Sequence, residues 1–400
     1  MIINKKTQIS ITITVAFFLI DSSSATLSYN VKSFGAKSNG KSDCTKAFLS
    51  AWGAACAAAQ PAEIHVPAGR YRLRNVVFSG KSCKNTAITI SIDGTLVAPS
   101  NYSVIGNSGS WLKFERVTGV SIYGGTLDGR GAALWACKNS GHNCPKGATT
   151  LAFYNSNNIS INALSSLNSQ MFHILIYGCH NVNLMNVKIS ADGNSPNTDG
   201  IHIEQSSAVA ILGSRIGTGD DCVSIGPGAS DLLIENLFCG PGHGISIGSL
   251  GWNLQEAGVQ NVTIKTATFR GTQNGLRIKT WARPSNGFVK DVYFQHIVID
   301  NAKYPIIIDQ NYCPDHNNCP SQDSGVKISN VRYEDVHGTS ATQIAVKFDC
   351  SKTNPCSEIT LDGVNLTFKD NPANATASCE NAGGTANDVV EPTSCLNEER

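Results

Sequence analysis

The chain has 400 residues, of which 15% are charged and 41% are hydrophobic, and its formal net charge at pH 7 is +1. A chain so close to neutrality has no overall electrostatic field that would attract nucleic acid or an anionic membrane surface. Any anionic ligand must therefore be held by a few local cations.

Residues 1–25, the first segment along the chain, are typical of a secretory signal peptide. Two lysines open the segment, an apolar stretch follows and small residues close it: Lys5, Lys6, Ile9 to Ile20, and Ser23-Ser24-Ala25. The apolar stretch is too short to span a bilayer, and no other segment approaches membrane length. We therefore expect a secreted protein whose mature domain spans residues 26–400; a buried N-terminal strand is the alternative interpretation. Removing residues 1–25 leaves a formally neutral chain.

Residues 43–56 predict a short amphipathic helix near the start of the mature domain. Their apolar side chains share one helical face: Ala47, Phe48, Ala51, Trp52 and Ala55. Ser42 or Asp43 can cap the start of this helix. Such a helix is suited to covering the first unit of a repetitive fold.

A repeat of short β-branched runs follows, from about Val117 to Leu366, and each run ends in Gly, Asn or Asp. One series begins at Phe172, Gly200, Cys222, Gly244, Gly275 and Pro305, and a second begins at Val182, Val209, Leu232, Val262 and Val292. Units of two or three short strands that cannot bury their apolar face alone predict an all-β, single-domain parallel β-helix. A β-sandwich has a similar strand density, but the recurrence of whole strand-turn-strand units favours the solenoid.

The chain contains 14 cysteines, an even number that suits disulfides in an oxidising compartment. Closely spaced cysteines predict five local bridges: Cys137/Cys144, Cys222/Cys239, Cys313/Cys319, Cys350/Cys356 and Cys379/Cys395. The remaining four, Cys44, Cys56, Cys83 and Cys179, allow three connectivities. Zinc is disfavoured because no CxxC pair is present. We expect the tail after Asp370 to close the C-terminal end as a disulfide-tied loop.

Aligning four repeats places chemically active residues in register. With Ile201, Val223, Ile245 and Leu276 aligned, the residues two positions earlier are Asp199, Asp221, His243 and Asn274, and those one position later are His202, Ser224, Ser246 and Arg277. Equivalent positions on stacked parallel strands lie about 4.8 Å apart. We expect Asp199, Asp221 and His243 to form a ladder on one outer edge, with Asp220 turned differently and with Arg277 and Lys279 nearby.

Each of these motifs alone has an ordinary interpretation. Gly219-Asp220-Asp221 is compatible with a calcium site or a solvated turn, and Gly242-His243-Gly244 with a turn that exposes a histidine. Independent turns have no reason to fall in register on successive coils. Their alignment favours an active site in which three carboxylates and two cations perform acid–base chemistry on an anionic ligand.

Four motifs resemble the signature motifs of the polygalacturonases, family 28 of the glycoside hydrolases: NTDGIH (197–202), GDDCVSIG (219–226), GHGISIGS (242–249) and RIKT (277–280). The resemblance extends from FGAKSNGKSD (34–43) to VKFDCSKTNPC (346–356) and is strongest with the plant branch. It implies a right-handed parallel β-helix and hydrolysis of α-1,4-galacturonosyl bonds in pectin, with inversion and without a metal or other cofactor.

The resemblance also implies roles for individual residues. Asp220 would be the general acid, Asp199 and Asp221 would hold and deprotonate the attacking water, and His243 would tune the carboxylates. Substrate binding would fall to Asn197, Arg277, Lys279 and Tyr312. Inversion predicts a wider separation of acid and base than in retaining enzymes, and three neighbouring aspartates should raise at least one pKa.

Three rival functions fit parts of the pattern. A pectate lyase would share the fold and substrate but would rely on calcium and an arginine base. A rhamnogalacturonan hydrolase fits less well, because His243 and RIKT suit a carboxylate on each neighbouring sugar. A non-catalytic pectin-binding β-helix would be expected to have lost one of the named residues. Loops 135–146 and 250–258 would decide between endo and exo cleavage, which the sequence leaves open.

The expected partner is pectin or homogalacturonan, in the cell wall, with no nucleic-acid or membrane partner. A monomer is expected because a capped solenoid has no open edge. Glycosylation acceptor motifs begin at five asparagines, and we expect some to be used: Asn101, Asn158, Asn261, Asn365 and Asn374.

Overall fold

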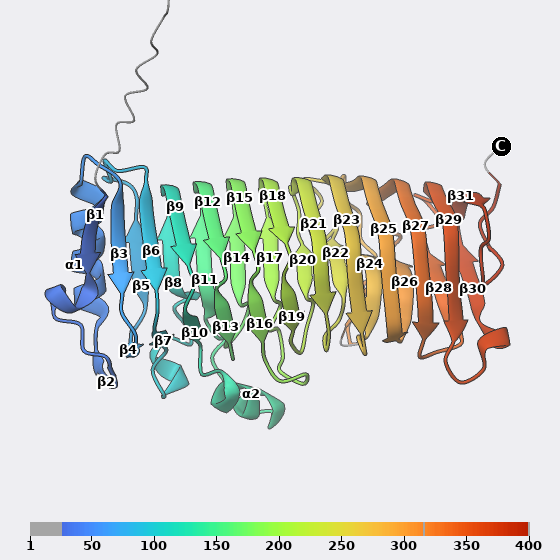
Figure 1. The fold of residues 1–400 in the computed structure, drawn as a ribbon. Coiled ribbons are helices and arrows are strands. Elements are labelled where there is room, and N and C mark those ends of the chain that lie inside the picture. Colours follow the sequence, from blue (N-terminus) through green and yellow to red (C-terminus); the bar gives the residue numbers. More distant parts are fainter. Residues whose placement is uncertain (1–25, 315–316, 399–400) are drawn as a thin grey trace, which may run out of the picture.

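The computed structural model describes residues 26–314 and 317–398, so the expected signal peptide lies outside the described residues. These residues form the right-handed parallel β-helix that the sequence predicts. Figure 1 shows one elongated stack of strands, with helix α1 (Thr45–Ala57) at the N-terminal end and β31 at the other end. Among the described residues, no helix has the length and apolar character needed to cross a membrane.

One face of the stack is an eleven-stranded parallel sheet, and this sheet carries the candidate site. Its strands are β5 (Val76–Ser79), β8 (Ser110–Glu115), β11 (Thr149–Tyr154), β14 (Ile174–Tyr177), β17 (Ile201–Glu204), β20 (Val223–Ile225), β22 (Ile245–Leu250), β24 (Asn274–Thr280), β26 (Tyr304–Asp309), β28 (Ile344–Asp349) and β30 (Thr376–Glu380).

The other strands wrap around the remaining faces in two series that belong to one sheet. The first comprises β1 (Leu27–Asn30), β3 (Ala62–Val66), β6 (Ile88–Ile92), β9 (Thr118–Tyr123), β12 (Asn157–Asn162), β15 (His180–Met185), β18 (Ser207–Leu212), β21 (Ser230–Cys239), β23 (Val259–Arg270), β25 (Phe288–Ala302), β27 (Lys327–Ser340), β29 (Cys356–Phe368) and β31 (Ala382–Asn387). The second comprises β2 (Asn39–Asp43), β4 (Arg70–Arg72), β7 (Thr95–Val97), β10 (Thr126–Asp128), β13 (Ser165–Leu167), β16 (Lys188–Ser190) and β19 (Arg215–Gly217), and it merges into the long strand β21. Short helical segments lie between them: η1 (Val31–Phe34), η2 (Tyr102–Val104), α2 (Ala132–Asn139) and η3 (Pro372–Asn374).

The register predicted from the repeat is confirmed. Ile201 pairs with Val223, Val223 with Ile245, and Ile245 with Leu276 along the eleven-stranded sheet. The second series of runs is also aligned as predicted, from Val182 to Val292. The stacking therefore brings residues that are 22 to 31 positions apart in the sequence onto adjacent strands.

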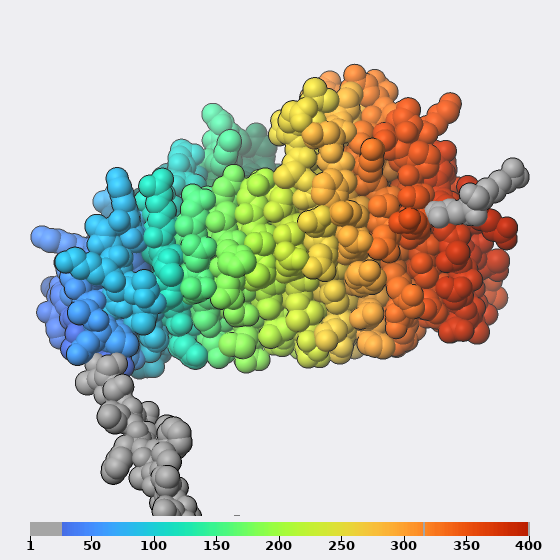
Figure 2. Space-filling view, turned by 90° about the horizontal axis from the view of Figure 1, so that it is seen from above, coloured from blue at the N-terminus to red at the C-terminus, as the bar shows by residue number. Residues whose placement is uncertain are grey.

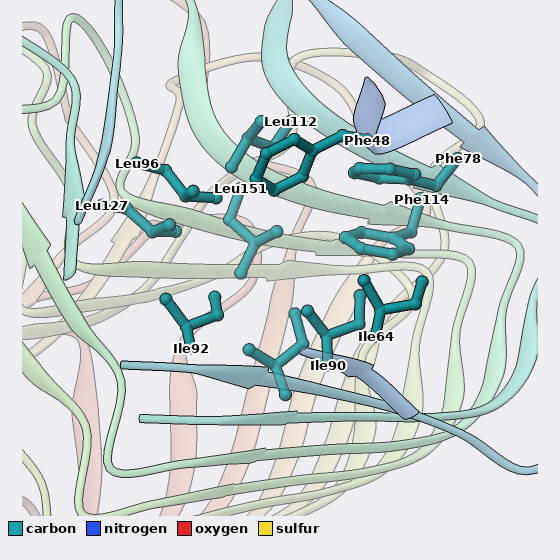
Figure 3. A pocket seen from close by; sticks show the side chains of 11 residues that line it. Phe48, Ile64, Phe78, Ile90, Ile92, Leu96, Leu112, Phe114, Leu127 and Leu151 are labelled. Carbon is teal, nitrogen blue, oxygen red and sulfur yellow. The ribbon is translucent and has the colours of Figure 1, made fainter. Parts of the chain in front are cut away.

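The interior is filled by rows of apolar side chains that repeat from coil to coil. Near the N-terminal end, Phe78, Phe114 and Phe153 stack with ring centroids 4.6 and 4.8 Å apart. The same row continues as isoleucine through the coils that carry the candidate site, for example Ile203 and Ile225. A void of about 30 Å³ lies beside these phenylalanines, and Figure 3 shows the side chains that surround it. Its eleven lining side chains are all apolar, so a water inside would lack partners, and the void belongs to the core packing.

Helix α1 covers the first coil as predicted, although it begins at Thr45 instead of residue 43. Asp43 precedes the helix, and its carboxylate accepts hydrogen bonds from the Thr45 N–H and hydroxyl. Phe48 and Trp52 of the predicted apolar face are buried; Trp52 lies edge-on to Phe114 at 5.7 Å and donates from its indole to the Ser79 carbonyl.

All five local disulfides that the sequence predicts are present. Of the other four cysteines, Cys56 and Cys83 form a sixth bridge, whereas Cys44 and Cys179 are free and buried. The expectation of complete pairing was wrong because Cys44 follows β2 on the first coils and Cys179 precedes β15. Those strands lie several rungs apart, which exceeds the Cα separation of about 7 Å that a disulfide can bridge.

The C-terminal tail differs from the simple loop that the sequence predicts. It contains β30 and β31, which pair with β28 and β29 and so add one more rung to the stack. The disulfide between Cys379 and Cys395 then ties the last residues to that rung. These strands bury few side chains: none in β30 is buried, and in β31 only Ala382 and Gly384 are, which accounts for the little apolar periodicity of the tail.

Candidate active site

The candidate site lies where the chain enters successive strands of the eleven-stranded sheet. Backbone hydrogen bonds tie the entry turns together, from Gly200 N–H to the Asp221 carbonyl (2.9 Å) and from His243 N–H to the Asp220 carbonyl (2.8 Å). Gly219 is required beside the aspartate pair, because a Cβ at this position would lie 2.2 Å from the Ser195 carbonyl oxygen. The glycine thus lets the Asp220-Asp221 turn press against the turn of the preceding coil.

A cleft of about 700 Å³ opens over these turns. Figure 2 shows two raised regions on one long side of the solenoid, one teal to green and one yellow to orange, with a recess between them. The cleft is lined by polar and aromatic side chains from successive coils: Asn197, Asp220, His243, Gln273, Asn274, Arg277, Tyr304, Ile307, Asp309, Asn311, Tyr312, Cys313, Pro314 and Lys347.

Asp220 is the aspartate of the three that reaches the cleft, and its side chain is 20% exposed. Its Oδ1 lies 3.1 Å from Nδ1 of His243, which also lines the cleft. The same oxygen accepts a hydrogen bond of 2.8 Å from the Asp221 N–H. Asp220 therefore has the position that a group exchanging a proton with a bound ligand needs.

Asp221 is buried beneath the cleft, with 1% of its side chain exposed. Its Oδ1 accepts from Arg277 Nη2 (2.7 Å) and from the Ser246 hydroxyl (2.9 Å), and its Oδ2 accepts from Lys279 Nζ (2.8 Å). Burial alone would raise the pKa of Asp221, but the charges of Lys279 and Arg277 outweigh it and lower that pKa to about 2. Asp221 is thus ionised in any physiological medium.

Asp199 lies one coil away and has the opposite charge preference. Its Oδ2 accepts a hydrogen bond of 2.6 Å from the Ser224 hydroxyl, and it is 7% exposed. Burial raises the pKa of Asp199 well above its ordinary value, and the negative charges of Asp220 and Asp221 raise it further. Lys279 acts on Asp199 only as the smallest of the opposing influences.

These observations refine the predicted ladder. The row of Asp199, Asp221 and His243 is present, but the side chains of the two aspartates are buried instead of lying on an outer edge. The prediction that Asp220 turns differently from Asp221 is confirmed by its exposure to the cleft.

The wide separation of acid and base predicted from inversion is not found between Asp220 and Asp221. One oxygen of each lies within 4.8 Å of the other. The physical reason is that the two residues are consecutive and share a hydrogen bond from the Asp221 N–H to Asp220. An acid and base separated by the roughly 6.5–9.5 Å usual in inverting enzymes would therefore have to include Asp199 in place of Asp221.

The four residues predicted to bind substrate also gather here. Asn197, Arg277 and Tyr312 line the cleft, and the Tyr312 ring lies 5.2 Å from Lys279 Nζ. In this structure, however, both cations form hydrogen bonds with Asp221: Arg277 with one of its oxygens and Lys279 with the other. An anionic ligand would therefore have to share them with that aspartate.

Within the described part of the chain, one group of side chains has the spacing of metal ligands, formed by Asp220, Asp221 and His243. Both oxygens of Asp221 already accept hydrogen bonds from cationic side chains. A cation at this point would have to displace Arg277 or Lys279 from Asp221, so the donor set is a poor fit for a metal.

Sequence reasoning aligned His202, Ser224 and Ser246 but gave them no role. Ser224 bonds Asp199, and Ser246 bridges the Arg277 Nε–H and Asp221. His202 contacts Ser224, with Nδ1 2.8 Å from its hydroxyl oxygen. The signal that could have found them is their row, which lies one residue after the aligned apolar position and so faces the cleft floor.

The chain matches the family model described as glycosyl hydrolases family 28 over residues 56–395. The chain belongs to this family. A polygalacturonase of Prunus persica is 60% identical over 394 residues, which cover 98% of this chain and 100% of the relative. An exopolygalacturonase of Platanus acerifolia is 40% identical and covers 89% and 94%, respectively. An endo-xylogalacturonan hydrolase of Aspergillus tubingensis has the same fold, with a TM-score of 0.75 at 22% identity over 91% of this chain and 99% of that one. This family 28 chain is therefore a glycosidase, as its motifs predict.

Proposed function

We propose that this family 28 enzyme hydrolyses the α-1,4-galacturonosyl bonds of pectin by a single displacement, with Asp220 as the general acid. The observation that carries this assignment is the position of Asp220, which faces the cleft beside His243 while Asp199 and Asp221 lie buried behind it. A proton on Asp220 can reach the leaving glycosidic oxygen, and His243 orients the carboxyl group that donates it.

The attacking water is proposed to lose its proton to Asp199, while Asp221 holds the water in place. Asp221 is a weak base, because its pKa is about 2 and both of its oxygens accept from cations. Asp199 is the stronger base once ionised, because its pKa is raised and it accepts one hydroxyl hydrogen bond. The same two ion pairs make Asp221 a poor nucleophile, which favours attack by water over a covalent intermediate.

The substrate class is proposed from the cations and the aromatic ring at the cleft. Arg277 offers a planar fork and Lys279 a point charge, and both suit the carboxylates of neighbouring galacturonate units. Tyr312 lies over both cations, 6.0 Å from Arg277 and 5.2 Å from Lys279, and closes that side of the cleft. The proposal also draws on the polygalacturonase of Prunus persica, which is 60% identical over almost the whole chain.

Asp220→Asn tests the central assignment. Removing the general acid should lower turnover of polygalacturonate by about 10² to 10⁴-fold while oligogalacturonate still binds. Asp335→Asn is the matched control, because Asp335 is an exposed aspartate on β27 that does not line the cleft. Turnover by Asp220→Asn at the wild-type rate, measured as reducing ends, would rule out Asp220 as the acid.

Early products of de-esterified polygalacturonate, formed at mildly acidic pH with chelator present, test the reaction and its mode. Mixed oligomers would assign endo cleavage, and monomer from the start would assign exo cleavage. A β-configured new end by proton NMR is expected from a single displacement, and an α-configured end would mean two displacements. A folded protein without products would favour a pectin-binding function instead.

We further propose a glycosylated, extracellular monomer. Six disulfides support an oxidising compartment, and all five acceptor asparagines are exposed. The mass of the secreted protein before and after enzymatic deglycosylation, together with light scattering, tests the glycans and the oligomeric state. An unglycosylated chain retained inside the cell would overturn this proposal.

A further inference from the structure

Four polar side chains form a continuous hydrogen-bonded row from the buried Asp199 towards solvent. The Ser224 hydroxyl donates to Asp199 Oδ2 at 2.6 Å, and its oxygen lies 2.8 Å from His202 Nδ1. On the other side of the ring, His202 Nε2 lies 3.3 Å from Glu204 Oε2. The β-helix fixes this row, because His202 and Ser224 are paired residues of β17 and β20 and Glu204 follows on the same strand face.

The histidine in this row is held in one orientation. Its ring stacks on Phe172, with centroids 4.8 Å apart and an interplanar angle of 21°. The His202 side chain is 14% exposed and that of Glu204 is 32% exposed. The row therefore begins at a buried carboxyl group and ends at one that water reaches, and the ring between them cannot rotate without losing its stacking.

The hydrogen bonds allow two arrangements that contain the same number of protons. In the first, Asp199 is protonated and donates to Ser224, Ser224 donates to His202 Nδ1, and the His202 Nε2–H faces Glu204. In the second, Asp199 is a carboxylate that accepts from Ser224, and His202 carries a proton on both nitrogens, facing Ser224 and Glu204. Conversion breaks the Asp199 O–H bond and forms the His202 Nδ1–H bond, while Ser224 gains one proton and gives up another.

We propose that His202, acting through Ser224, takes up the proton of Asp199 and so provides the carboxylate that activates water. The inference rests on the proposed function, in which Asp199 is the base. No proton enters or leaves the row in this step, and the Glu204 carboxylate stabilises the resulting imidazolium. His202 is thus a positioning residue that acts on Asp199 and does not touch the substrate.

The charges around Asp199 explain why an internal acceptor is useful. Asp220 and Asp221 both face Asp199, and their negative charges oppose its ionisation. The two nearby cations, Arg277 and Lys279, both bond Asp221 and not Asp199. An imidazolium at His202 would add a positive charge that is linked to Asp199 through the single hydroxyl of Ser224.

His202→Gln tests the proposal, because glutamine can still bond Ser224 but cannot take up a proton. We expect kcat on polygalacturonate at mildly acidic pH to fall about tenfold, with KM changed less than about twofold. The acidic limb of the pH–kcat profile should move to higher pH. Ser224→Ala should move it in the same direction, and the double variant should lose little more than either single one, since both interrupt one row.

His180→Gln is the matched control. His180 also has a serine partner, with Nδ1 2.9 Å from the Ser207 hydroxyl, but this pair is exposed on β15 and β18, away from the aspartates. It should keep the wild-type pH profile. In addition, Asp199→Asn should change the imidazole ¹⁵N chemical shifts of His202 and leave those of His180 unchanged, a readout that requires no activity.

Circular dichroism and thermal melting first establish that each variant is folded. An acidic limb that stays in place in folded His202→Gln and Ser224→Ala would overturn the proposal, as would losses that simply add in the double variant. Failure of the proposed function has a different signature, because the wild type itself would then not cleave polygalacturonate. If the imidazole ¹⁵N chemical shifts of His202 did not change in Asp199→Asn, the proposed coupling between Asp199 and His202 would be contradicted in either case.

Discussion

Asp199 and Asp221 occupy equivalent positions on neighbouring coils, and both are buried, yet their surroundings differ in one respect. Asp221 accepts hydrogen bonds from Arg277 and Lys279, whereas Asp199 accepts one from a serine hydroxyl. Desolvation penalises both charges, so the two cations decide the outcome, and the pKa of Asp221 falls to about 2 while that of Asp199 rises.

A repetitive fold can therefore build a reactive site from equivalent backbone positions that have different side-chain partners. The backbone register gives each coil the same geometry, as the pairing of Ile201 with Val223 shows. Chemical differences then come from side chains on another coil, since both cations lie on β24, two strands beyond β20. A coil without such a neighbour leaves its carboxyl group inclined to keep a proton.

Asp221→Asn is the variant expected to have the largest effect on stability. It leaves two buried cations without their counter-ion, and breaking a buried pair in this way costs about 3 kcal/mol or more of unfolding free energy. Asp349→Asn is the control, because Asp349 lies on the same sheet and pairs with Lys347 at 3.4 Å near the surface. That pair should be worth less than about 1 kcal/mol. Equal losses in urea-induced unfolding of the two variants would contradict this account of Asp221.

Acid should lower the free energy of unfolding through Asp221 as well, by less than the Asp221→Asn substitution does. The folded-state pKa of Asp221 is depressed from 3.8 to about 2, so its contribution is present above pH 3.8 and is lost as pH falls through 2. A shift of this size corresponds to roughly 2 kcal/mol. Unfolding free energies at pH 4 and pH 2 should therefore differ more in the wild type than in Asp221→Asn. A difference of the same size in both proteins would mean that other carboxylates cause the acid loss.

The strand register and the local disulfides of this molecule could be predicted from the sequence, but the partners of the two aspartates could not. The spacing of Ile201, Val223, Ile245 and Leu276 predicts the register, because a one-residue slip would turn every apolar side chain outward. Cysteines separated by 6 to 17 residues predict their bridges, since so short a loop leaves few other partners.

What the sequence could not supply depends on side-chain reach across coils. The length of Arg277 and Lys279 lets both reach back to Asp221, and no pattern in the chain indicates which aspartate they choose. The same applies to Cys44 and Cys179, whose distance from each other depends on how many coils separate them. Burial of Asp199 beneath the cleft also follows from the packed turns and not from its own neighbours in sequence.

Asp199→Asn should change stability in the opposite direction to Asp221→Asn. The folded-state pKa of Asp199 is raised, so its contribution is fully present below pH 3.8 and is lost as pH rises through the folded-state value. At pH 7 the burial of this carboxyl group is a cost that a neutral amide avoids, while the amide oxygen still accepts from Ser224. We therefore expect the free energy of unfolding to rise at pH 7 in this variant and to stay unchanged at pH 3. Urea-induced unfolding at both pH values measures it, and a loss of stability at pH 7 would show that Asp199 is held as a charge by partners beyond Ser224.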